Sequence, residues 1–214
     1  MEHVAHESHQ HHEDHHQMGS TNAMAVSATL HCLTGCAIGE ILGLVIGTAL
    51  GLGNVATIAI AVGLAFLFGY ALSTLPLLRA GLGVGAALTV VLAADTLSIA
   101  TMEVVDNLVM AVIPGAMEAG LVNPVFWLSM MLALTVAFFA AWPVNRYLLA
   151  RGKGHALTHE FHGATPTGSR RLIPDLATST LVAAITAFML GGLLVSTADR
   201  VLEEPATGHA QQLR

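Results

Sequence analysis

The stretch MAVSATLHCLTGCAIGEILGLVIGTAL, residues 24–50, decides the fold class. It holds a single carboxylate, Glu40, and neither lysine nor arginine. An apolar run of about 18 or more residues with so little charge predicts a transmembrane helix. Each such run is long enough for roughly 30 Å of hydrocarbon at about 1.5 Å per residue. Four further runs follow, at residues 55–78, 84–113, 125–149 and 174–197. The sequence therefore predicts an all-α membrane protein, a bundle of about five transmembrane helices.

The composition of the whole chain agrees with a lipid environment. Only 10% of its 214 residues are charged and 54% are hydrophobic, whereas soluble domains carry about 25% charged residues. The net charge of −6 offers no basic surface for nucleic acid. Nucleotide-binding and hydrolase motifs are absent, which favours a non-enzymatic role without a nucleotide. We expect one transmembrane domain over residues 23–200, followed by a polar tail at 201–214.

The chain opens with a polar leader, MEHVAHESHQHHEDHHQMGSTN, residues 1–22. Its low apolar content predicts disorder. Histidines are concentrated here, and they would suit weak collection of metal ions or a plain solvated tail. The candidate collecting residues are His9, His11, His12, His15 and His16, with a second group at His155, His159 and His162.

The basic residues predict the orientation of the chain. With five spans, the segment between spans two and three and the segment between spans four and five share a side with the N-terminus. Those segments hold Arg79, Arg146, Arg151, Lys153, Arg170 and Arg171, whereas the other side holds Arg200 and Arg214. The positive-inside rule places the N-terminus in the cytoplasm and the C-terminus outside, in a multi-pass plasma-membrane protein.

The first span carries a polar stripe and a glycine stripe on one broad face. The polar members are His31, Cys32, Cys36 and Glu40. The glycines recur every four residues at Gly35, Gly39, Gly43 and Gly47. Small residues at this spacing let a second helix approach closely, which is a packing role and could also pair two copies of the chain. The cysteines have two interpretations, as small interface residues or as metal ligands.

The third span has carboxylates and thioethers on one face, namely Asp95, Met102, Glu103, Asp106 and Met110. A carboxylate in mid-membrane costs at least about 2.5 kcal/mol on insertion scales. It is therefore expected to face the bundle interior or a wet cavity. A structural hydrogen-bond network and an ion or proton site both fit this pattern, and the ion site is the favoured interpretation.

Three stretches carry a family resemblance: LHCLTGCAIGEILGLVIGTALG at 30–51, LAADTLSIATMEVVDN at 92–107 and WPVNRYLLARGKGHALTHEFH at 142–162. Together they resemble a family of small bacterial membrane proteins called domain of unknown function 4396, over about residues 28–162. The resemblance implies an integral protein of the bacterial cytoplasmic membrane. It implies no activity and no functional residues.

The residue types on spans one and three lead to our first functional hypothesis. Cysteine, methionine, histidine and carboxylate together are typical ligands of transition metals, and sulfur favours Cu(I). We expect a permease or binding protein for a transition-metal ion, copper before zinc. Its ligands would come from His31, Cys32, Cys36, Glu40, Asp95, Met102, Glu103, Asp106 and Met110. Two alternatives stay open: a membrane redox protein that uses the cysteines with haem or quinone, and a non-enzymatic accessory subunit of a larger complex.

Overall fold

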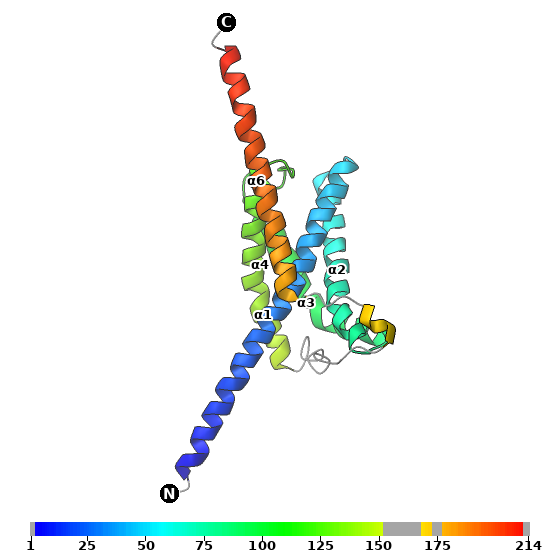
Figure 1. Cartoon of the computed structure of the whole chain (residues 1–214), viewed down its shortest axis with the longest axis vertical. Helices are drawn as coiled ribbons and strands as arrows, with labels where there is room; N and C mark the ends of the chain where they lie inside the picture. Colours follow the sequence, from blue (N-terminus) through cyan, green and yellow to red (C-terminus); the bar gives the residue numbers. More distant parts are fainter. Residues whose placement is uncertain (1–2, 152–167, 173–176, 212–214) are drawn as a thin grey trace.

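The computed structural model describes residues 3–151, 168–172 and 177–211, and this part of the chain is helical without any strand (Figure 1). Four long helices and a short 3-10 turn carry the chain to a fifth long helix. Their bounds are α1 His3–Ala49, α2 Asn54–Arg79, α3 Val84–Val112, α4 Pro124–Ala150, η1 Gly168–Leu172 and α6 Thr178–Gln211.

The helices confirm a multi-pass membrane architecture. By length and hydropathy, four segments can cross a bilayer: Thr21–Ala49, Asn54–Arg79, Pro124–Ala150 and Ser179–Leu202. Helix α3 consists of two halves, Val84–Ala93 and Asp95–Val112, which meet at an angle of 51°. Counted together, the two halves make a fifth span. The described chain thus has four to five candidate spans, in agreement with the predicted bundle.

Two predicted boundaries differ from the structure. The leader, expected to be disordered, continues the first span, because α1 begins at His3. Ala, Glu and Gln tolerate a helix, and a stable span supplies the nucleus from which the helix propagates. At the other end, α6 extends to Gln211 and takes up most of the expected polar tail. Figure 1 shows both extensions projecting away from the bundle at opposite ends of the molecule.

Helices α1 and α2 pack with almost no space between their backbones. A methyl group built on Gly39 would lie 2.2 Å from the Ala65 nitrogen, and one on Gly35 would lie 2.6 Å from the Gly69 Cα. Gly43 meets Ala61 of α2 in the same way. The glycine stripe of the first span is thus filled by α2 of the same chain, and a second copy would have to use another face.

Helix α3 bends where its polar face begins. The Thr96 hydroxyl donates to the Leu92 carbonyl oxygen of the preceding turn, and it also shares a 2.8 Å hydrogen bond with the Tyr70 hydroxyl of α2. The same kind of bond links Thr101 to the Leu97 carbonyl oxygen further along α3, so the bond of Thr96 alone does not account for the bend. The bend turns the segment that starts at Asp95 into the bundle, next to α1.

Helix α6 lies on α4 and α1 through a small contact. Gly192 of α6 leaves room for the Trp127 ring of α4, since a methyl group there would lie 2.3 Å from the ring. The Trp127 Nε1 donates to the Leu121 carbonyl oxygen at 2.7 Å, which fixes the ring. Most of the α6 surface remains outside the bundle, as expected of a helix that faces lipid.

Candidate functional site

The two cysteines lie at the centre of the bundle, where α1 meets α3. Cys32 and Cys36 are 0% and 1% exposed, and both are free thiols. They belong to one buried cluster with Met102 of α3. The other members are small or aliphatic residues of α2, α3 and α4: Ala65, Ile99, Ala137 and Ala141. Because cysteines four residues apart share a helix face, both side chains leave α1 on the same side, one turn apart.

Polar groups surround Cys32 on the side of the α3 bend. Its thiol interacts with the carboxylate of Asp95 and with the hydroxyls of Ser98 and Ser73. All three partners are buried, two on α3 and one on α2. This end of the site therefore joins three helices around one sulfur atom.

Three carboxylates gather one helical turn further along, around Cys36. The thiol of Cys36 interacts with Glu103 and Glu40. Glu40 in turn interacts with Asp106 and Glu103. All three acids are buried. The face predicted from the sequence on α1 thus meets the face predicted on α3.

Their oxygen atoms lack hydrogen-bond donors. Both oxygens of Glu40 and Glu103, and one oxygen of Asp106, have no hydrogen-bond partner within the described chain. An ionised carboxylate only accepts hydrogen bonds, so neighbouring carboxylates cannot satisfy one another. Such groups need a proton, water or a cation to offset the cost of burial.

The structure separates some of the predicted ligands. Met110 belongs to a different core cluster, which α1, α3, α4 and α6 share, and it lines the cavity described below together with Glu40 and Asp106. His31 lies half-buried on α1 and does not line the cavity described below. The leader histidines precede the first span, which begins at Thr21. The positions His155, His159 and His162 fall outside the described residues.

Over residues 3–151, 168–172 and 177–211, no group of three His, Cys, Asp or Glu side chains is arranged to hold a metal ion. The arrangement is therefore two thiols and a thioether packed together, with carboxylates on both sides.

A cavity of about 290 Å³ lies beyond the carboxylates, between the α1–α2 turn and the α3–α4 connection. Glu40 and Asp106 line its buried end. The predicted ligand Met110 also lines it, together with residues that the sequence prediction did not include, among them Asn54, Thr57, Asn107 and Glu118. Asn107 directly follows Asp106, which was a usable signal, whereas Asn54 and Glu118 come from turns whose position the sequence does not give.

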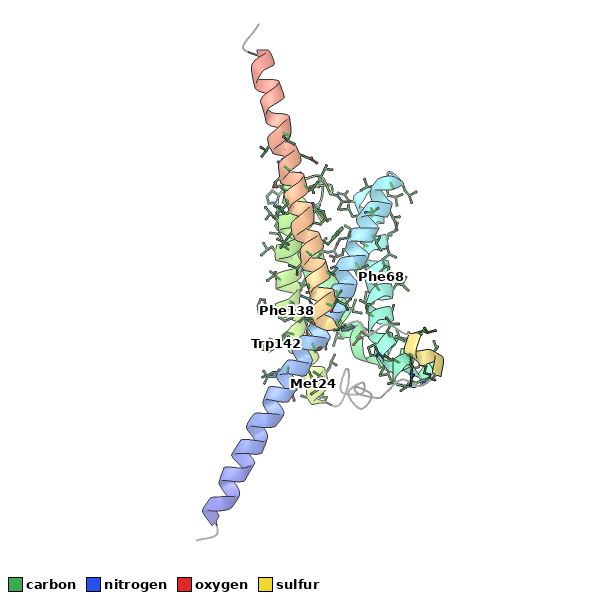
Figure 2. All side chains as sticks on the ribbon, in the orientation of Figure 1. Met24, Phe68, Phe138 and Trp142 are labelled. Carbon is green, nitrogen blue, oxygen red and sulfur yellow. The ribbon has the colours of Figure 1, made fainter. Side chains whose placement is uncertain are left out.

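Figure 2 shows Phe68 on α2 and both Phe138 and Trp142 on α4, apolar side chains of the helices that enclose α1 and α3.

The fold and the site together define a multi-pass α-helical membrane protein with thiols and carboxylates buried between two of its helices. The family model described as Domain of unknown function (DUF4396) matches residues 21–154. The match covers more than half of the chain, and the protein belongs to this family. No curated protein and no solved structure gives a significant match.

Proposed function

We propose that this protein binds a transition-metal ion inside the membrane, with Cu(I) as the first candidate, as a permease or a metal-binding protein. The observation that carries the proposal is the buried cluster of Cys32, Cys36 and Met102 between α1 and α3. Two thiols and a thioether are the soft ligands that select Cu(I) over harder cations. Such a site needs few ligands, so it is compatible with the lack of a three-membered His, Cys, Asp or Glu group in the described chain.

The flanking carboxylates support the same function through their charge. A bare cation in a low-dielectric interior is costly, and so is an unpaired carboxylate. Asp95 lies beside Cys32, and Glu103 lies beside Cys36. A cation bound between the two sulfur atoms would be attracted to both acids. The attraction would offset the cost of burying the cation and the cost of burying the carboxylates.

The orientation is part of the proposal. Arg79, Arg146 and Arg151 stand at one end of α2 and α4, and η1 contributes Arg170 and Arg171. The positive-inside rule would assign this end, together with the His-rich start of α1, to the cytoplasm. Histidines there would meet metal ions on the cytoplasmic side of the sulfur cluster.

A double substitution tests the metal site. In purified protein loaded with Cu(I) under reducing conditions, Cys32→Ser with Cys36→Ser should lower bound copper from about one ion per chain to background. Met102→Leu keeps the volume but removes the thioether, and it should weaken retention of copper against a competing chelator. Ser196→Ala, at a buried hydroxyl of α6 far from the cluster, is the matched control. Equal copper content in the double variant and the wild type would refute the proposal.

A further inference from the structure

We infer that the cavity between the α1–α2 turn and the α3–α4 connection is a water-filled vestibule for hydrated cations, on the side of the membrane away from the basic segments. This inference rests on the proposed function, because the vestibule would be the route by which a cation reaches or leaves the buried metal site. The ligand is a hydrated cation. Carboxylate oxygen atoms would attract it before it binds to the sulfur atoms of the cysteines or after it leaves them.

The buried end of the cavity carries uncompensated acid groups. Glu40 is 6% exposed and Asp106 is 4% exposed, yet both line the cavity. Neither oxygen of Glu40 has a hydrogen-bond partner in the part of the chain that is described, and the buried Oδ1 of Asp106 has none either. Two nearly buried carboxylates that line an open volume, and that have each other rather than a basic donor as a neighbour, indicate that the volume supplies further partners.

The cavity connects these acids to the surface. Its wall includes exposed polar residues, Thr48, Asn54 and Glu118, on the turn side and on the α3–α4 connection. The volume of about 290 Å³ exceeds many times the roughly 30 Å³ that a water molecule occupies in the liquid. Apolar side chains form the larger part of the wall, but polar groups stand both at the mouth and at the floor. The cavity can therefore hold water, unlike a wholly apolar void.

The charge around the cavity has one sign. The described residues that line it include the carboxylates of Glu40, Asp106 and Glu118 but no Lys, Arg or His. Glu103 and the Cys36 thiol stand directly behind its floor. A cleft lined by one sign of charge and enclosed by low-dielectric walls concentrates ions of the opposite sign by about tenfold or more.

The cavity suits a hydrated ion better than a bare one. In the described chain no three His, Cys, Asp or Glu side chains stand close enough to strip and ligate a metal. Carboxylates can instead attract an ion through its water shell. The bare ion would be needed only at the sulfur atoms of Cys36 and Cys32, beyond the Glu40 carboxylate.

Charged thiol reagents can test the vestibule without any metal. We would place a reporter by Thr57→Cys, at a half-buried wall position, in a chain that also carries Cys32→Ser and Cys36→Ser. Rates of modification would be compared for a cationic and an anionic methanethiosulfonate of similar size. Val55→Cys in the same background is the control, since Val55 is 84% exposed near the α1–α2 turn and does not line the cavity. A control on the α3–α4 connection would lie near Arg200, which donates to Asn123 and would disfavour a cationic reagent.

We expect the cationic reagent to be favoured at position 57 by at least about tenfold relative to the control position. Glu40→Gln with Asp106→Asn should bring the ratio close to the control value. Equal ratios at the two positions, or a reporter that reacts with neither reagent, would overturn the inference even if the neutralised variant failed to fold. The background lacks the cysteine ligands, so this result does not depend on copper binding. Failure of the metal site and failure of the vestibule are therefore distinguishable.

Discussion

Asn145 supplies a direct polar link between α4 and α1. Its Nδ2 donates to the Thr29 Oγ1 at 2.8 Å, and the Thr29 hydroxyl donates in turn to the Ala25 carbonyl oxygen at 2.7 Å. Both side chains are almost completely buried. Interhelical hydrogen bonds in membranes average about 0.6 kcal/mol and reach about 1.7 kcal/mol. We place this bond in that range, because neither partner can reach water.

A double-mutant cycle measures this bond. Asn145→Leu and Thr29→Val each remove one partner with a similar volume, and the other partner then lies buried without its bond. We expect a coupling energy of about 0.6 to 1.7 kcal/mol between the two positions. Reversible unfolding in mixed detergent micelles would give the four free energies of unfolding. Additive effects of the two substitutions would show that the bond contributes nothing.

Individual site residues were predictable where helical periodicity alone decides their direction. Cys32, Cys36 and Glu40 follow one another every four residues, so a single face was the only outcome for a straight helix. Contacts across helices were not predictable, because nothing in the sequence fixes the rotation of α3 against α1. Residues such as Asn54 and Glu118 were missed for the same reason, since turns place them.

At the scale of elements, the α1–α2 pair is the tightest contact of the fold. The backbones approach through small residues on both sides, Gly39 against Ala65 and Gly43 against Ala61. Lipid supplies no hydrophobic drive for helix association, so packing of this kind is a main source of affinity between spans. The close contact also fixes the rotation of α1, which directs its thiols and Glu40 toward α3.

Adding one methyl group should lower the unfolding free energy at a tightly packed glycine but not at a glycine with open space around it. Gly39→Ala would place Cβ 2.2 Å from the Ala65 nitrogen, and backbone atoms cannot move aside cheaply. We expect a loss of about 1–3 kcal/mol in unfolding free energy, the usual cost of overpacking. In Gly63→Ala, on α2, nothing lies within 4 Å of the new methyl group.

The control should keep or gain up to about 1 kcal/mol, because Ala is the better helix former. Melting temperatures of the two variants in detergent would compare them directly. If Gly39→Ala were as stable as Gly63→Ala, the close α1–α2 approach would be wrong.

The helices themselves were more predictable than their shapes. Hydropathy placed the spans within a few residues of their observed bounds, because burial in lipid requires a long apolar run. It contained no information on the bend before Asp95. It also misjudged the leader, since composition measures apolar content and not whether a neighbouring helix extends into a polar segment.

On the scale of the whole molecule, the polar interior runs along one line while the outside stays apolar. The line begins at the exposed mouth of the cavity and passes Glu40, Cys36 and Cys32 to the bend at Asp95. Lipid-facing surfaces of α2 and α6 carry large exposed apolar side chains instead, among them Leu67 and Leu194. A scaffold of apolar spans thus encloses the two helices that hold nearly all buried ionisable groups.

The number of crossings can be settled by locating the two ends of the chain. If bent α3 spans the membrane, five crossings put the termini on opposite sides, whereas four put them on the same side. We expect five, because Asp95 and Asp106 lie on one helix that connects the bend to the cavity side. Reporter fusions active only outside the cytoplasm should respond after Glu118 and after Arg214, but not after Arg151. If α3 does not cross, the fusions after Glu118 and Arg214 should both be inactive and the fusion after Arg151 should be active. That pattern would reject the five-span arrangement.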